Sequence, residues 1–184
     1  NDRRVIVFTE YVDTQRYLVR MLEAAFRDTG RFSQRIATLD GQPGGDDTRD
    51  ALKERFNADP AVDPLRILVC TDAAREGINL QSHCADLFHF DLPWNPSRLE
   101  QRNGRIDRKG QPAARVRCHY FELTQRPEDR VLSTLVAKTA TIQKELGSLG
   151  DVLATRVDSI FKNGLSRRNA PALEQSLAQL DLLV

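Results

Sequence analysis

Long apolar runs are absent from this 184-residue sequence, and none approaches the roughly 20 residues that a membrane-spanning helix needs. The first residues lead straight into a strand-like run, without the apolar core of a signal peptide. The three cysteines are odd in number and none lies in a C-x-x-C spacing, which favours structural thiols in a reducing compartment over disulfides. We therefore expect a cytoplasmic protein without a membrane segment.

Other absences concern ligands. The sequence has no G-x-x-x-x-G-K-[ST] loop, so the chain by itself cannot cradle the phosphates of a nucleotide. The histidines have no metal-ligand spacing, so we predict no metal site. The formal net charge is only +1, which excludes the global positive field of many nucleic-acid-binding proteins. Because the sequence starts abruptly without Met, we expect it to be a piece of a longer protein.

Short apolar runs alternate with segments of helical periodicity over residues 1–125. Continuous apolar runs predict strands buried on both faces at 5–8, 36–39, 67–70 and 87–90. Helical spacing predicts helices at 12–26, 46–56 and 96–108, and alternation predicts a strand near a sheet edge at 116–123. This order predicts an α/β fold, a twisted parallel sheet with helices on both faces. Ligands of such sheets bind at the carboxyl ends of the strands.

The character of the sequence changes after Pro127. A long amphipathic helix is predicted over 131–146, followed by helices at 151–161 and 172–183. This segment carries no chemical motif. We therefore predict a domain over 1–125 and a helical brace or extension over 126–184, which offers a surface to protein partners.

One arginine motif stands out between Gln101 and Arg108, with the pattern Q-x-x-G-R-x-x-R. Arg105 and Arg108 are three residues apart, so on a helical turn they project to one side. Gly104 keeps the adjacent backbone free of a side chain. Two planar guanidinium groups aimed at one spot suit a phosphate chain, which predicts half of a nucleotide site. The alternative is a surface helix whose arginines pair with neighbouring carboxylates.

Further polar segments follow the predicted strands. The stretch from Thr71 to Asn79 comes directly after a buried strand, and backbone N–H groups there suit a nucleic-acid phosphate with the Thr71 hydroxyl as a further donor. Within it, Gly77 allows a close approach and Asn79 can bond a ribose. The glycine-rich turn 40–45 and Thr9 hold equivalent positions at other strand ends. Each segment taken alone also fits an ordinary turn.

In this order the motifs resemble the second RecA-like lobe of superfamily-2 helicases, and among them most closely the Swi/Snf-type DNA translocases. The matching segments are Val5–Glu10 (motif IV), Leu39–Gly41 with Arg49 and Phe56-Asn57, Ile67–Gln81 (motif V), and Asn95–Gln111 (motif VI with its W-N-P lead and G-Q tail). Motif V reads D-A-A-R-E-G-I-N-L and motif VI ends D-R-K-G-Q. Both depart from eukaryotic remodellers and are similar to RapA-like or phage-defence ATPases of bacteria.

The resemblance implies roles for individual residues. Arg105 and Arg108 would be arginine fingers, with Gln101 also on the side of the γ-phosphate. Gly77, Asn79 and Gly104 would line the nucleotide. The residues that would hold DNA phosphates are Thr9, Gly41, Gln42, Thr71 and Arg75.

The resemblance also implies partners. ATP and Mg²⁺ would be held mainly by a separate N-terminal RecA-like lobe, and the two lobes together would translocate on double-stranded DNA. The isolated chain is then expected to be inactive. Two alternatives remain open: a lobe of a helicase that separates RNA or DNA strands, and a non-catalytic scaffold lobe that docks a partner through its C-terminal helices.

Overall fold

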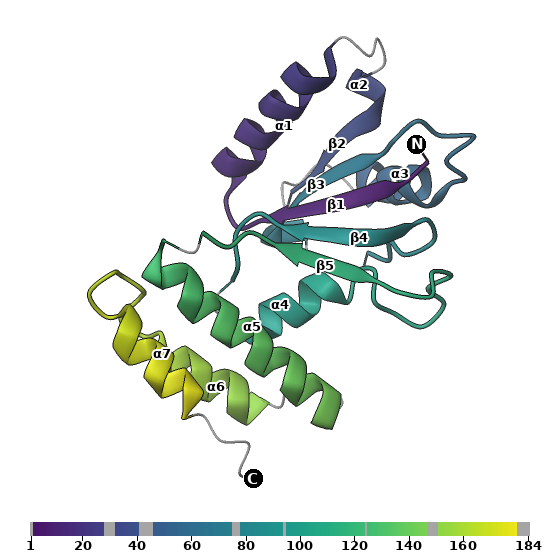
Figure 1. Cartoon of the computed structure of the whole chain (residues 1–184). Helices are drawn as coiled ribbons and strands as arrows, with labels where there is room; N and C mark the ends of the chain where they lie inside the picture. The colour runs from purple at the N-terminus through teal and green to yellow at the C-terminus, as the bar shows by residue number, and fades with distance from the viewer. Residues whose placement is uncertain are drawn as a thin grey trace. The chain divides into compact units, whose positions relative to one another are not determined.

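The computed structural model describes residues 2–27, 32–40, 46–74, 78–93, 95–123, 125–146 and 151–179. Two compact units emerge from these residues, one comprising 1–91 with 101–120 and the other 92–100 with 121–184. The elements in chain order are β1 Arg4–Thr9, α1 Val12–Phe26, α2 Phe32–Arg35, β2 Ile36–Leu39, α3 Asp46–Asn57, β3 Ile67–Thr71, a 3₁₀ turn Asp72–Ala74, β4 Cys84–His89, α4 Pro96–Asn103, β5 Arg117–Tyr120, α5 Pro127–Leu146, α6 Asp151–Ile160 and α7 Ala170–Ala178 (Figure 1).

The first unit is built on a parallel sheet with the strand order β2-β3-β1-β4-β5. Its central strands are rich in β-branched and aromatic residues, which favour extended backbone. Helix α1 packs along β2 and β3, and its buried Gln15 donates to the carbonyl oxygens of Leu39 and Val69 at 3.2 and 2.7 Å. The predicted α/β class with a parallel sheet is therefore confirmed.

One face of this sheet carries the core of the unit. Its side chains come from alternate positions that the register aligns, and Phe56 of α3 packs against them. Cys70 and Cys84 are free thiols inside this core, and burial raises the pKa of both. The fully described members of the core are Ile6, Phe8, Leu39, Phe56, Leu65, Leu68, Cys70, Ile78, Leu80, Cys84, Leu87 and Ile106.

Helix α4 ends at Asn103, five residues before the end predicted from the sequence. Gly104 follows directly, and glycine is a poor helix former because it loses much backbone freedom. The chain continues in turns, in which the Arg105 N–H donates to the Arg102 carbonyl at 3.1 Å and the Ile106 N–H to the Asn103 carbonyl at 3.1 Å. Arg105 and Arg108 therefore lie in a turn and not on the helix, contrary to the sequence prediction.

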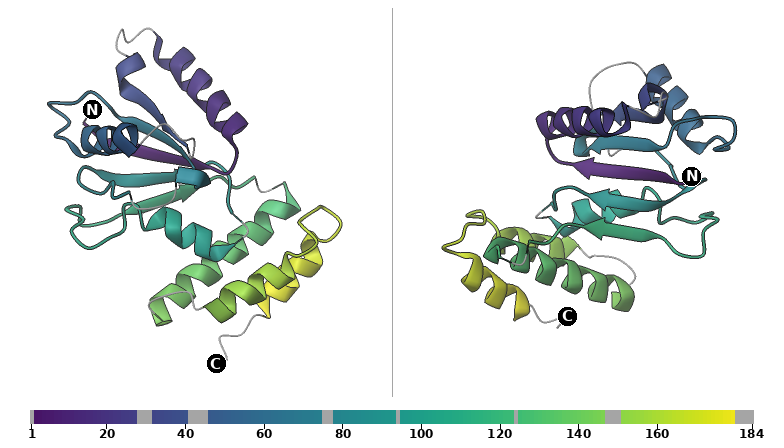
Figure 2. Two further views of the ribbon diagram at one scale, coloured as in Figure 1. Left: turned by 180° about the vertical axis from the view of Figure 1, so that it is seen from behind. Right: turned by 45° about the horizontal axis from the view of Figure 1, so that its top comes forward.

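Helices α5, α6 and α7 of the second unit lie against one another (Figure 2). Side chains of these helices and of the chain that joins α6 to α7 form a core of the unit's own. The buried members are Val131, Leu135, Val157, Phe161, Ala170 and Leu177. At the start of α4, the Asn95 side chain accepts from the Ser97 N–H at 2.8 Å and donates to Asp158 at 3.0 Å. Among the described residues, no helix is long and apolar enough to cross a membrane. The proposed domain boundary at residue 125 stays a prediction.

A buried arginine ties the first strand to the loop that precedes β3. Arg4 is 1% exposed, lies 5.5 Å from the centre of the Phe56 ring, and donates to three carbonyl oxygens. These belong to Leu65 at 3.1 Å, Asp63 at 3.4 Å and Phe56. Burial lowers the pKa of the Arg4 guanidinium.

We expect Arg4→Met to lower the free energy of unfolding by at least about 2 kcal/mol, because buried carbonyl oxygens lose their donor. Urea unfolding followed by circular dichroism measures the effect. The matched control is Arg16→Met on α1, where the side chain is 66% exposed and forms an ion pair with Asp13 at 3.5 Å. It should change the same free energy by less than about 0.5 kcal/mol. Equal effects of the two substitutions would contradict a structural role of Arg4.

Candidate functional site

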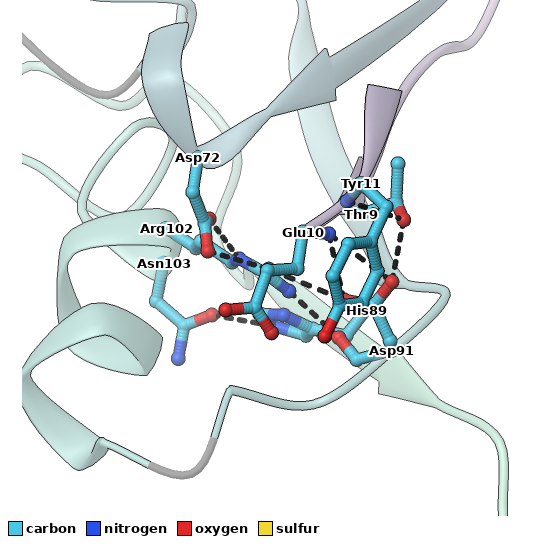
Figure 3. Close-up of polar contacts among 8 residues, drawn as sticks. All are labelled: Thr9, Glu10, Tyr11, Asp72, His89, Asp91, Arg102 and Asn103. Carbon is cyan, nitrogen blue, oxygen red and sulfur yellow. Dashed lines mark hydrogen bonds and ion pairs between the residues drawn. The ribbon is translucent and has the colours of Figure 1, made fainter. Parts of the chain in front are cut away.

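Polar side chains follow three neighbouring strands at the carboxyl edge of the sheet (Figure 3). Thr9 ends β1, Asp72 follows β3 directly, and Asp91 lies two residues beyond β4. Because β1 lies between β3 and β4 and all three are parallel, these residues meet at one edge. This is the edge at which ligands of parallel sheets bind.

Arg102, in the last turn of α4, joins these strand ends. Its Nε and Nη2 donate to the two carboxylate oxygens of Asp72 at 2.6 and 2.9 Å, a bidentate pair. Its Nη1 donates to the Asp91 carbonyl at 2.7 Å, and Nη2 also contacts the Asp91 carboxylate at 3.3 Å. The residue is 1% exposed, and its guanidinium lies 5.5 Å from the centre of the Phe8 ring. The charge is therefore held in one orientation.

The Asp91 carboxylate extends this network to β1. It accepts the Thr9 hydroxyl and the Glu10 N–H, the latter at 2.9 and 3.1 Å from its two oxygens (Figure 3). One carboxylate thus binds the end of the central strand and the buried arginine together. We call the set Thr9, Asp72, Asp91 and Arg102 the strand-end network.

A neutral histidine lies beside the network. Burial lowers the pKa of His89 from 6.5 to about 4, so its imidazole is uncharged near neutral pH. Nε2 lies 2.9 Å from the Asn103 Oδ1, an acceptor, which assigns the single proton to Nε2. Nδ1 is buried and has no hydrogen-bond partner among the described residues. His89 therefore fixes the Asn103 side chain, next to the turn that carries the arginine motif.

The two predicted finger residues are held against the chain that follows the 3₁₀ turn. Arg105 is partly buried, donates from Nη1 to the Ile78 carbonyl at 3.4 Å, and accepts at its own carbonyl from the Leu80 N–H at 3.1 Å. Its Nε is buried without a partner in the described part of the chain. Burial, followed by the charge of Arg108, lowers the pKa of Arg105. Arg108 is exposed and donates to the Asn79 side-chain oxygen.

The structure thus brings Arg105, Arg108 and Asn79 together, as expected of residues that face one ligand. Gly104 stands at the start of the same turn, and Gln101 is exposed. Their assigned roles stay predictions.

The residues predicted to hold DNA phosphates fall into two groups. Thr9 is completely buried with its hydroxyl engaged by Asp91, and Thr71 is 1% exposed with a hydroxyl that has no partner among the described residues. Both lie at strand ends as predicted, but neither is open to a ligand in this conformation. The remaining predicted site residues lie outside the described part of the chain: Gly41, Gln42, Arg75 and Gly77.

Sequence reasoning did not assign a ligand-binding or catalytic role to Asp72, Asp91, Arg102, His89 or Asn103. A signal for Arg102 was available. It lies three residues after Leu99 and four before Ile106, and both of these apolar residues are buried. In the predicted helix 96–108, helical periodicity puts Arg102 on the same buried face as these two residues. No comparable signal pairs it with Asp72, which is 30 positions away. Among the described residues, no group of three or more His, Cys, Asp or Glu side chains is arranged to hold a metal ion.

Comparison with known sequences gives matches over most of the chain. The pattern of the helicase conserved C-terminal domain matches residues 1–110. The uncharacterized ATP-dependent helicase YqhH of Bacillus subtilis is 37% identical over 152 residues, which cover 83% of this chain and 25% of that protein. The defense against restriction protein B of Escherichia phage P1 is 37% identical over 95 residues, or 52% of this chain and 4% of that protein.

A shorter match links the chain to the RNA polymerase-associated protein RapA of Yersinia pestis, 51% identical over 49 residues, which cover 27% of this chain and 5% of RapA. The chain thus spans a quarter or less of these relatives. Among solved structures, the C-terminal part of the Fun30 ATPase domain covers 95% of the chain with a TM-score of 0.54 and 20% identity, and 48% of that structure is matched. The yeast DEAD-box splicing factor Prp28 covers 85% with a TM-score of 0.56 and 18% identity, over 31% of its own chain. These likenesses confirm the fold.

We expect the burial of His89 to make stability depend on pH. Its folded-state pKa, about 4, lies below the ordinary value of 6.5, so protonation favours the unfolded chain. The contribution of neutral His89 to the free energy of unfolding is complete at pH values above 6.5, and it is lost as the pH falls towards the folded-state pKa of about 4. At about 1.4 kcal/mol for each pH unit between the two values, the loss is on the order of 3 kcal/mol.

Urea unfolding of the wild type and of His89→Gln, compared across this pH range, measures the effect. Gln keeps a donor for Asn103 but does not titrate, so the stability difference between the two proteins should shift in favour of the variant as the pH falls. A difference that does not change with pH would show that His89 titrates normally.

Proposed function

Since the chain belongs to the helicase conserved C-terminal domain family, we propose that it is the second motor lobe of an ATP-dependent translocase on double-stranded DNA. The observation that carries this proposal is the turn 104–108, which presents Arg105 and Arg108 beside Asn79. Arginine side chains on one turn are suited to the charge that develops on a transferred phosphoryl group. The 37% identity to an ATP-dependent helicase over 83% of the chain supports the same conclusion.

The arginine turn fits a nucleotide phosphate by its donors. Arg105 keeps a buried Nε without a partner, and Arg108 bonds only one oxygen, that of Asn79, among the described contacts. Both guanidinium groups remain cations, since arginine is not deprotonated in proteins. ATP, when bound, supplies the phosphoryl group whose transfer to water releases the free energy for movement.

The role of this chain is to bind and orient that phosphate. Arg105 and Arg108 would donate to its oxygens, and Gln101, in α4 just before the turn, would lie on the same side of the phosphate. Gly104 lets the backbone approach closely, and Gly77 and Asn79 are the residues that we assign to the ribose on the resemblance alone. In this proposal the Walker loop and the ligands of Mg²⁺ would come from a second, N-terminal lobe, since these 184 residues contain no such loop and match only 25% of the helicase YqhH.

DNA is bound at the carboxyl ends of the strands. The Thr71 hydroxyl has no partner among the described residues, and Thr9 lies on the neighbouring strand. Both are buried in this conformation, so they would reach DNA only when the strand ends open. With Gly41, Gln42 and Arg75 they would contact phosphates, not bases, so binding is salt-dependent and largely independent of sequence. The choice of double-stranded DNA rests on the resemblance of Asn95–Gln111 to the motif VI of Swi/Snf-type enzymes.

The arginine turn is tested in the protein that carries this chain together with its Walker lobe. Arg105→Ala and Arg108→Ala should lower kcat, and at least one of them by about 10³-fold or more, with little change in DNA affinity. Arg115→Ala, at an exposed arginine in the loop before β5, is the matched control and should leave kcat unchanged. The chain without the Walker lobe should hydrolyse no ATP. Normal turnover in both finger variants would refute the assignment.

The nucleic-acid ligand is tested by ATPase stimulation with duplex DNA, single-stranded DNA and RNA. Duplex DNA should stimulate most strongly. Thr71→Ala should raise the DNA concentration for half-maximal stimulation, because a hydroxyl donor is lost, whereas Thr71→Ser keeps the hydroxyl and should resemble the wild type. If RNA stimulates the ATPase most strongly, the proposed translocase is wrong and a strand-separating helicase is the function that the result supports. A complete lack of turnover in the full protein would favour a scaffold lobe.

A further inference from the structure

The arginine turn and the chain around the 3₁₀ turn are joined at several points. Asp72 binds Arg102 before the turn, while Ile78 and Leu80 bond Arg105 within it. A side-chain contact between Asn79 and Arg108 closes the far end. The predicted DNA contact Thr71 is the residue next to Asp72. The predicted DNA site at Thr71 and the predicted nucleotide site at the arginine turn are thus connected. Thr71 is adjacent in sequence to Asp72, Asp72 forms a buried ion pair with Arg102, and the turn follows Arg102 closely along the chain.

Arg102 anchors the chain immediately before the arginine turn. Its carbonyl accepts the Arg105 N–H at 3.1 Å, so a hydrogen bond joins the backbone of Arg102 directly to the turn. Its side chain has a bidentate bond to Asp72 and packs over the Phe8 ring. A planar fork with two bonds fixes direction as well as distance, which a single point charge does not. Asn103, the next residue, is held by His89.

Resting on the proposed function, we propose that Asp72 and Arg102 are positioning residues for the arginine turn. Their ion pair sets the place of Arg105 and Arg108 relative to the end of β3.

The same sheet contains a second ion pair of nearly the same geometry. Asp86 on β4 accepts from Nε and Nη2 of Arg117 at 2.7 and 2.9 Å, and Asp86 is 9% exposed. This pair joins β4 to the edge strand β5, and within the described part of the chain it makes no hydrogen bond to the arginine turn. It therefore offers a control with the same chemistry at a place that has no positioning role.

The test compares Asp72→Asn with Asp86→Asn in the protein that carries the Walker lobe. Each substitution keeps the shape of the side chain and removes its charge. Asp72→Asn should lower kcat by about 100-fold, the cost of a small misplacement of catalytic groups, with KM for ATP and affinity for duplex DNA unchanged. Asp86→Asn should leave kcat, KM and DNA affinity unchanged. Thermal unfolding of each variant gives the temperature at which the folded enzymes are compared.

A double-mutant cycle with Arg105→Ala identifies the route of the effect. If Asp72 acts through Arg105, then Asp72→Asn should cause little further loss of kcat in the Arg105→Ala protein. Equal additional losses in both backgrounds would overturn the inference, as would a normal kcat for Asp72→Asn. If Asp72→Asn does not fold, Arg102→Lys replaces it, since lysine keeps the charge but not the fork. A normal kcat in Arg102→Lys would also overturn it.

The outcome separates this inference from the proposed function. Loss of kcat in Arg105→Ala with normal kcat in Asp72→Asn contradicts only the positioning role. Normal kcat in Arg105→Ala contradicts the arginine-finger assignment itself.

Discussion

The buried guanidinium of Arg102 is the constraint on which the candidate site depends. A cation that is 1% exposed is tolerated only where carboxylates and carbonyl oxygens take the place of water. Asp72 and Asp91 supply these oxygens from the ends of β3 and β4, and Asp91 also binds Thr9 on β1. Three neighbouring strands must therefore end together for one charge to be satisfied. The carboxyl edge of the sheet is ordered by this requirement as much as by its apolar core.

The arginine turn begins beside this buried ion pair. The turn follows Arg102 directly, and its two arginines bond the segment that follows the 3₁₀ turn. Such preorganisation suits catalysis of phosphoryl transfer, which depends on positioned positive charge more than on covalent chemistry. On the proposed function, this chain of the helicase conserved C-terminal domain family would contribute half of an active site without a phosphate loop of its own.

The amino-acid sequence predicts much of this fold because the strands are short apolar runs and the motifs follow their ends. The arginine motif and its neighbours in order were sufficient to recognise the family. The end of α4 was predicted too late, since the arginine spacing suggested a helix and the effect of Gly104 was underestimated. The strand-end network was not predicted, because Arg102 and Asp72 are 30 positions apart and only the folded sheet brings them together. Nor does the sequence reveal that Thr9 is buried against Asp91.

Transition-state affinity tests the central claim, that the arginine turn acts on the phosphoryl group, most directly. ADP with aluminium fluoride is an analogue of the transition state of phosphoryl transfer, whereas ADP alone is not. In the protein that carries the Walker lobe, the wild type should bind this analogue much more tightly than ADP. Arg105→Ala should lose most of this difference in affinity, while its affinity for ADP alone is unchanged. An Arg105→Ala protein that keeps the full difference would contradict the account.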